Sequence, residues 1–269
     1  EMNDEERFLL IKPFTINFMM NLIIEDLAAI SIYQDIFISE QDLVSNGKID
    51  EAIKALKKSN LIYEGVLEPP KGKKPDDWEP RPQMLFKSTK YGDEVDRPLQ
   101  KSNKEWTYFA NDIAYHFDKY QRGSNHLVDI LGADHGGYVK RMTAAVAALS
   151  DNKASFTAKL CQMVKLTRNG KQIKMSKRSG EFITLREVID EVGSDSIRFM
   201  MLYRKNEAPL EFDFTKVTEQ SKDNPVFYVQ YAHARISSVI SKLNENNFSH
   251  MPSNFENIDF TLIDNKHEL

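Results

Sequence analysis

Five cations crowd one short stretch of the chain, with no acidic residue between them. Within residues 164–182, VKLTRNGKQIKMSKRSGEF, they occupy the eleven residues 168–178 and are Arg168, Lys171, Lys174, Lys177 and Arg178. The whole chain has a formal net charge of -4, so this positive charge is a local feature. Lysine is a flexible point charge that suits phosphate, and nearby glycine and serine let the backbone bend and offer donors. The composition fits a phosphate-binding loop, but it also fits a solvated surface loop with accidental charge.

Nucleotidyl transfer from ATP is the chemistry that such a loop could assist. Its transition state places extra negative charge on the α-phosphate and the departing pyrophosphate, which mobile cations can neutralise where water is excluded. An Asn-Gly turn at residues 169–170 predicts a hairpin before the loop. A capping box after it, with Thr184 as N-cap and Glu187 at the third helical position, predicts a helix. The loop between these anchors could close over a substrate.

Composition indicates a folded protein, and its mild acidity argues against uniform binding along nucleic acid, although a local basic stripe could still bind phosphate. The chain has 269 residues, of which 41% are hydrophobic, enough for a substantial core. Its single cysteine excludes an internal disulfide and fits a reducing compartment, so we expect a cytoplasmic protein. We find no signal peptide and no apolar run of the roughly 20 residues that a membrane span needs, and therefore expect no membrane partner.

The elements around the cationic loop predict an α/β fold. Residues 14–30 are apolar on both faces and predict a buried helix, whereas residues 33–40 alternate like a strand. The stretch that begins at Ile49, IDEAIKALKK, predicts an amphipathic helix. From Asp112 onward, strands alternate with helices. HLVDILG (126–132) predicts a strand buried on both faces of a parallel sheet, and residues 155–166 predict a further strand.

Several motifs together resemble one enzyme family. Residues 174–178, KMSKR, resemble the KMSKS signature of class I aminoacyl-tRNA synthetases. TYFANDIAYHFDKY, DILGADHGGYVKRM and EQSKDNPVFYVQYAHARI extend the resemblance to bacterial arginyl-tRNA synthetases over nearly all of residues 14–243. This implies an arginine–tRNA ligase of protein synthesis, which activates L-arginine with ATP to arginyl-adenylate and transfers it to tRNA(Arg). ATP would be a substrate, Mg²⁺ would arrive with the nucleotide, and no metal site of the protein's own is expected.

The resemblance also implies an architecture. We expect the C-terminal half of a class I synthetase Rossmann-like parallel sheet with a β-rich insertion, followed by the start of an α-helical anticodon-binding domain. Residues 1–63 would be a helical and strand part of the catalytic domain, and 64–107 the insertion. Residues 108–212 would be the second half of the nucleotide-binding catalytic domain, and 213–269 the beginning of the helical domain. We expect a monomer.

An arginine pocket is implied by a Y-x-x-x-D stretch, which Tyr108 and Asp112 match here. An aspartate offers a planar, bidentate acceptor to a guanidinium group, and a tyrosine can stack on that group or bond to it. The alternative is a local ion pair for Asp112 and a core position for Tyr108. His135 lies in a loop where many family members carry a glutamine, so its contact with arginine stays open.

Nucleotide and tRNA contacts complete the implied site. Lys174 and Lys177 would contact phosphate, with Lys177 acting in the transition state. Met175 and Ser176 would shape the loop and its adenosine contact, and Arg178 completes the ATP-binding motif. On the helix after residue 224, Tyr231 and Arg235 could approach tRNA, although core and salt-bridge roles are equally open.

One family signature is missing. Class I synthetases pair KMSKS with H-x-G-H, whose histidines contact ATP, and no H-x-G-H occurs in these 269 residues. We therefore expect an internal segment of a longer enzyme, a split-gene product or a truncated form, unable to form arginyl-adenylate unaided. Two alternatives remain: a non-catalytic arginine- or tRNA-binding remnant, and another nucleotidyltransferase with a KMSKS-like loop.

Overall fold

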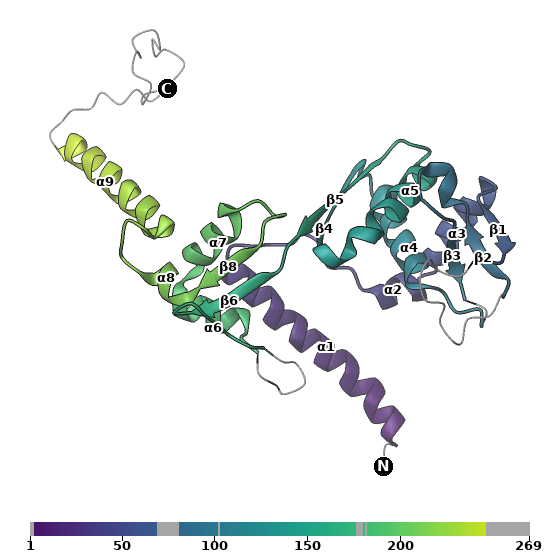
Figure 1. Cartoon of the computed structure of the whole chain (residues 1–269). Helices are drawn as coiled ribbons and strands as arrows, with labels where there is room; N and C mark the ends of the chain where they lie inside the picture. Colours follow the sequence, from purple (N-terminus) through teal and green to yellow (C-terminus); the bar gives the residue numbers. More distant parts are fainter. Residues whose placement is uncertain (1–2, 69–80, 102, 176–179, 181, 246–269) are drawn as a thin grey trace, which may run out of the picture.

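Two lobes make up the described part of the chain, which comprises residues 3–68, 81–101, 103–175, 180 and 182–245 of a computed structural model (Figure 1). One lobe contains helices α2 to α5 and a three-stranded sheet. The other contains α6 to α8 and a second three-stranded sheet. Strands β4 and β5 run between the lobes, while the long helices α1 and α9 extend away from them (Figure 1).

The first lobe packs four helices against an antiparallel sheet of order β1-β2-β3. The helices are α2 (Glu40–Ser45), α3 (Lys48–Lys58), α4 (Tyr108–Gln121) and α5 (Val139–Ser150). The strands are β1 (Ile62–Gly65), β2 (Gln83–Phe86) and β3 (Arg97–Gln100). The sheet shares its core with α3 and α4 through Phe86 and Leu99, so the β-rich segment is packed directly on the neighbouring helices.

Helix α3 confirms the predicted amphipathic helix. Its four apolar residues Ile49, Ala52, Ile53 and Leu56 are all buried. Burial of a leucine or isoleucine side chain contributes roughly 1.5–3 kcal/mol each. The lysines of the opposite face stay in solvent, and α3 therefore fixes the position of α4, against which it packs.

A parallel pair of strands, β4 (His126–Gly132) and β5 (Ser155–Cys161), leads out of this lobe. A 3₁₀ segment, η2 (Ala133–Tyr138), joins β4 to α5. The predicted strand at 126–132 is confirmed, but its burial on both faces is wrong. Leu127 is buried, whereas Ile130 is 66% exposed. Because the described sheet has only these two strands and no layer on its second face, that face meets solvent.

The second lobe is built on a mixed sheet of order β7-β6-β8. Its strands are β6 (Val164–Arg168), β7 (Lys171–Gln172) and β8 (Leu210–Asp213), and its helices are α6 (Leu185–Val192), α7 (Ser194–Tyr203) and α8 (Phe214–Thr218). Phe212 and Phe214 are its largest fully buried side chains. The predicted strand at 155–166 is divided, because Asn206 bonds to the backbone of Leu160 and Gln162 and turns the chain from β5 into β6.

The predicted Asn-Gly hairpin is confirmed at the junction of β6 and β7. Asn169 and Gly170 both have positive φ, at 51° and 71°, as a type I′ turn requires.

The predicted α/β class is likewise confirmed as a mixed arrangement of helices and strands. The parallel pairs β4–β5 and β6–β8 lie in two separate sheets among the described residues, so a continuous Rossmann-like sheet stays a prediction.

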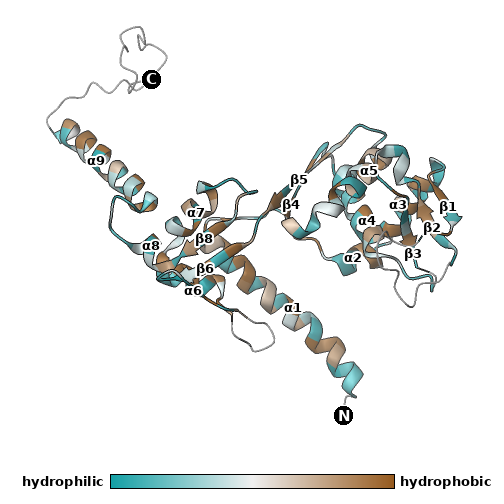
Figure 2. Ribbon diagram, viewed as in Figure 1, coloured by the Kyte–Doolittle hydropathy of each residue, from teal (hydrophilic) through white to brown (hydrophobic). Residues whose placement is uncertain are grey.

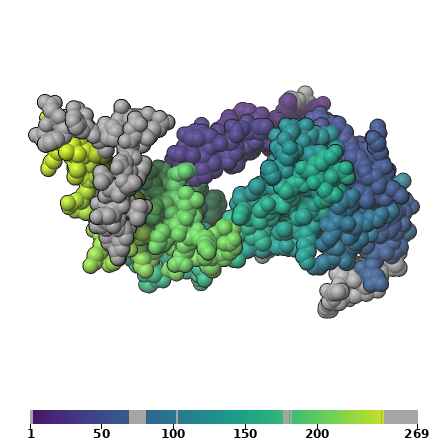
Figure 3. All heavy atoms as spheres, turned by 90° about the horizontal axis from the view of Figure 1, so that it is seen from above, coloured from purple at the N-terminus to yellow at the C-terminus, as the bar shows by residue number. Residues whose placement is uncertain are grey.

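The predictions for the first forty residues are wrong in two respects. Helix α1 (Asp4–Ala29) forms, but none of its residues is buried, and residues 33–39 form no strand. Apolar residues recur along α1 (Figure 2), which lies on the outer surface of the molecule (Figure 3). Helix α1 is also long and apolar enough, by length and composition alone, to cross a membrane. The expectation that no apolar stretch is long enough for a membrane span is therefore wrong for α1, although a signal sequence near the N-terminus passes the same test.

Candidate functional site

Asp112 projects from the second turn of α4. Thr107 begins this helix by accepting a hydrogen bond from the backbone N–H of Ala110, and the buried residues Ile113 and Ala114 hold the helix against the core. Asp112 is half-buried on the adjoining face. Tyr108, one turn earlier, is 82% exposed. The structure thus places the two predicted residues on one helix, but only Asp112 enters a pocket.

A cavity of about 390 Å³ opens beside Asp112 at the carboxyl end of β4. We call it the Asp112 pocket. It is lined by residues of α4, β4 and η2, namely Asp112, Tyr115, His116, Lys119, Val128, Asp129, Ile130, Leu131, His135 and Tyr138. The predicted residue His135 therefore does lie with Asp112. Tyr138, the last residue of η2, also lines this pocket.

A smaller cavity of about 200 Å³ adjoins Asp112 from the other side. Glu40, the first residue of α2, lines it, and the Glu40 carboxylate accepts a hydrogen bond of 2.8 Å from the Asn111 side-chain nitrogen. Among the described residues, the buried Oδ1 atom of Asn111 has no partner. Two carboxylates and an amide oxygen thus face one region, a donor-poor set that suits a ligand rich in N–H groups. Sequence analysis did not identify Glu40 as a site residue, because Glu40 lay at the end of an expected strand.

Opposing effects set the pKa of Asp112. Burial raises it above the ordinary value, whereas the Tyr138 hydrogen bond and nearby His116 lower it by a smaller amount. The negative charges of Glu40 and Asp129 add to the increase. A cation in the pocket would counter this, because a positive charge favours the ionised carboxylate.

A network of charged side chains connects α4 to β4. His116 is 3% exposed and contacts two acceptors, the backbone oxygen of Asp112 at 2.7 Å and the Asp129 carboxylate at 2.8 Å. Only the doubly protonated imidazolium donates to both. Lys119 adds a second cation 2.9 Å from Asp129. Burial alone would raise the pKa of Asp129, but these two partners outweigh it and lower the pKa to about 2.

Lys174 and Met175, the described part of the KMSKR loop (residues 174–178), lie in the other lobe. Lys174 and Met175 are exposed after β7, and neither lines the two cavities at Asp112. The predicted ATP-binding residues Ser176, Lys177 and Arg178 lie outside the described residues. The part of the loop that the structure describes therefore shares no cavity with Asp112.

Both predicted anchors of the loop are present. The backbone N–H of Gly170 donates a 2.8 Å hydrogen bond to the Asp213 carboxylate, which ties the hairpin turn to β8. Thr184 and Glu187 form the predicted capping box at the start of α6. The ends of the loop are thus held by side chains that make no contact with Asp112.

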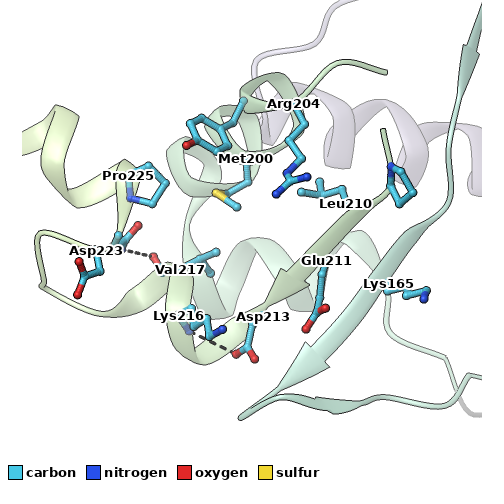
Figure 4. Close-up of a pocket in the computed structure, with 13 residues that line it drawn as sticks. Lys165, Met200, Arg204, Leu210, Glu211, Asp213, Lys216, Val217, Asp223 and Pro225 are labelled. Carbon is cyan, nitrogen blue, oxygen red and sulfur yellow. Dashed lines mark hydrogen bonds between the residues drawn. The ribbon is translucent and has the colours of Figure 1, made fainter. Parts of the chain in front are cut away.

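A third cavity, of about 490 Å³, lies in the second lobe (Figure 4). It contains charges of both signs, among them Lys165, Arg204 and Glu211. Asp213, also in its lining, accepts hydrogen bonds from the backbone at the start of α8. No residue that the sequence analysis singled out lines this cavity, and its mixed charge favours no single ligand.

Tyr231 and Arg235 lie one turn apart on α9 (Pro225–Glu245). The Arg235 guanidinium donates a 3.1 Å hydrogen bond to the Tyr231 hydroxyl and lies 5.7 Å from the centre of its ring. Both side chains are exposed in the described part of the chain. Among the residues that the structure describes, no group of His, Cys, Asp or Glu side chains could hold a metal ion.

Comparison with known proteins gives one consistent result. The chain is 60% identical over 235 residues to an arginine–tRNA ligase of Ruegeria pomeroyi, which covers 87% of this chain and 40% of the relative. It is 53% identical over 270 residues to an arginine–tRNA ligase of Parvibaculum lavamentivorans, covering 100% of this chain and 46% of the relative. The chain thus spans less than half the length of these curated relatives. No model of a protein family matches it.

Solved structures agree with the sequence relatives. A structure described as an arginyl-tRNA synthetase of Campylobacter jejuni superposes with a TM-score of 0.69 at 34% identity, covering 85% of this chain and 46% of that one. The arginyl-tRNA synthetase of Thermus thermophilus superposes with a TM-score of 0.60 at 17% identity, over 81% of this chain and 44% of that one. The second likeness concerns the fold alone.

Proposed function

The chain is homologous to the arginine–tRNA ligases, and from this premise we propose that it carries the arginine pocket and the nucleotide loop of such an enzyme. The reaction would activate L-arginine with ATP, with Mg²⁺ on the nucleotide, and transfer the arginyl group to tRNA(Arg). The observation that carries the proposal is the acidic site at the start of α4. There Asp112 and Glu40 line adjoining cavities in a chain similar to enzymes named for arginine.

Arginine recognition would rest on the Asp112 carboxylate. A guanidinium group presents a rigid fork of N–H donors, and a carboxylate accepts two of them in parallel. Glu40 would add a second acceptor, and His135 would lie near the other end of the ligand. Tyr108 would approach arginine from the solvent side of α4, where its exposed ring is available to stack.

Nucleotide chemistry would belong to the KMSKR loop. We propose Lys174 and Lys177 as phosphate contacts, with Lys177 neutralising charge on the departing pyrophosphate. Ser176, Arg178 and Met175 would complete the nucleotide contact. The hairpin and the capping box that hold the ends of the loop support a segment that closes on ATP. Tyr231 and Arg235 on α9 would contact tRNA.

A second candidate function is an arginine- or tRNA-binding protein without catalysis. One observation favours it: the 269 residues contain no H-x-G-H motif. In this case the Asp112 pocket would bind arginine, but arginine and ATP would not react on the chain alone.

Calorimetric titration of the chain with L-arginine tests the pocket that both candidates share. We expect binding of L-arginine, and little binding of L-citrulline, whose side chain has the same shape but no charge. Asp112→Asn should weaken arginine binding by about 10-fold to 100-fold, since a hydrogen bond to a charged group contributes about 1.5–3 kcal/mol. Equal binding of arginine and citrulline would refute the proposed arginine pocket.

A further inference from the structure

Asn111 links α4 to α2 beside the Asp112 carboxylate. Its side-chain nitrogen Nδ2 donates a 2.8 Å hydrogen bond to Oε1 of Glu40, the first residue of α2. The two helices pack against each other (Figure 1), and Glu40, Asn111 and Asp112 line one cavity of about 200 Å³. Because a carboxylate only accepts hydrogen bonds, the amide atom that faces Glu40 is the nitrogen. The bond therefore fixes the orientation of the amide as well as that of the carboxylate.

The other end of the amide argues against a purely structural role for Asn111. Its Oδ1 atom is buried and has no hydrogen-bond partner among the described residues. A buried acceptor without a partner destabilises the folded state, so an apolar side chain would suit the packing of α4 better. Within the described residues, the hydrogen bond that the Asn111 side chain does make is the one to Glu40.

Glu40 needs such a partner because its side chain is exposed. An exposed glutamate side chain loses rotamer freedom when a ligand fixes it, and a side chain that is held in place beforehand loses less on binding. The Glu40 carboxylate offers about four acceptor positions. Asn111 occupies one of them and leaves the others to a ligand with several N–H groups.

We propose that Asn111 is a positioning residue for arginine: its side-chain amide holds the Glu40 carboxylate beside the cavity that Asp112 also lines, so that both carboxylates accept from one guanidinium group. This inference rests on the proposed function, since it assigns a support to the same pocket. It is independent of the KMSKR loop and of ATP. Asn111 occupies the variable position before Asp112 in the Y-x-x-x-D stretch, so the motif assigns it no role.

Asn111→Ala removes the donor together with the unpartnered Oδ1 atom. We expect L-arginine affinity, measured by calorimetry, to fall by about 3-fold to 10-fold, the range of one hydrogen bond. The midpoint of urea denaturation should not fall, because the buried acceptor is removed as well. Gln100→Ala is a matched control. The Gln100 amide nitrogen also donates one bond, of 2.7 Å, to the backbone oxygen of Lys104, but Gln100 lines neither cavity at Asp112, so arginine affinity should stay unchanged.

A second background separates positioning from a structural link between the two helices. In Glu40→Gln the side chain loses its charge, but its amide oxygen can still accept from Asn111, so the link between α2 and α4 is kept. If Asn111 acts by orienting the Glu40 charge, Asn111→Ala should weaken arginine binding by less than about 2-fold in this background. A purely structural link would give the same factor in both backgrounds.

The outcomes distinguish the two proposals. A wild-type chain that binds arginine, together with an Asn111→Ala variant of equal affinity, would overturn the inference and leave the arginine pocket standing. The same loss in the wild-type and Glu40→Gln backgrounds, or an equal loss in Gln100→Ala, would also count against positioning. A wild-type chain without arginine affinity would overturn the proposed function and this inference together.

Discussion

At the scale of single residues, the Asp112 site combines groups that lie far apart in the sequence. Asp112 was predicted from the resemblance of Tyr108 and Asp112 to the Y-x-x-x-D stretch of the family. Glu40 reaches the same region across 71 residues of sequence, through its bond to Asn111. The proximity of Glu40 to Asp112 depends on how α2 packs against α4. The site therefore holds one more carboxylate than the local Y-x-x-x-D motif indicates.

The acidity leads to a prediction for Glu40→Gln. Removal of this negative charge should lower the pKa of Asp112, because Glu40 is one of the groups that raise it. Arginine affinity should nevertheless fall, by about 10-fold, since a charged acceptor is lost. Calorimetry measures the affinity and carboxyl NMR the pKa. An unchanged pKa of Asp112 in the Glu40→Gln variant would contradict the assigned role of Glu40.

Asp129 lines the Asp112 pocket and should also matter for the stability of the fold. It is the shared acceptor of His116 and Lys119, and Asp129→Asn would leave the buried His116 imidazolium without its counter-charge. We expect a loss of about 3 kcal/mol in the free energy of unfolding, measured by urea denaturation. Glu191→Gln, which removes an exposed ion pair with Arg168, should change that free energy far less.

The pH dependence of stability follows from the same group. The pKa of Asp129 is lowered to about 2 in the folded chain, against roughly 3.9 for an unperturbed aspartate. Its stabilisation is therefore complete above about pH 4 and is lost as the pH falls toward about 2. Wild type should lose about 2 kcal/mol over that window, and Asp129→Asn should not show this component.

At the scale of elements, sequence patterns predicted the structure reliably where the residues that bond to one another lie close together in the sequence. The Asn-Gly turn and the capping box are closed by residues two or three positions apart, and both formed as predicted. The amphipathic spacing of α3 also identified its buried face. The prediction failed at residues 33–39, because a strand needs a neighbouring strand and alternation alone does not supply one.

The cap of α6 gives a prediction at this scale. Thr184→Ala removes the acceptor for the backbone N–H of Glu187 and should reduce the free energy of unfolding by about 1 kcal/mol. It should also loosen the C-terminal anchor of the KMSKR loop, seen as faster amide hydrogen exchange at Ile183 and Leu185. Thr143→Ala in the middle of α5 is the control, since its hydroxyl bonds only within the helix. Equal effects of both substitutions would argue against a specific role for the cap.

At the scale of the whole molecule, burial is what the sequence predicted least well. Helix α1 and the outer face of β4 have the composition of core elements, yet they are exposed in this chain. Periodicity indicates which residues can be buried, but the partner that covers them is a property of the tertiary structure. The class of fold could be predicted from the sequence, and Asp112 from its resemblance to a family motif, whereas Glu40 required the packing of α2 against α4.

The last prediction concerns ATP-dependent chemistry. The described part of the KMSKR loop and the Asp112 pocket share no cavity, and the chain has no H-x-G-H motif to contact ATP from the other side. We therefore expect the 269-residue chain to bind L-arginine but to release no AMP from ATP, even with arginine and tRNA(Arg) present. A polypeptide bearing the H-x-G-H part of a related arginine–tRNA ligase, added in excess, should restore arginine-dependent pyrophosphate exchange. Exchange should then be lost in Lys177→Ala, whose arginine affinity stays that of the wild type. AMP release by the chain alone would contradict this prediction, because its own residues would then suffice to neutralise the triphosphate.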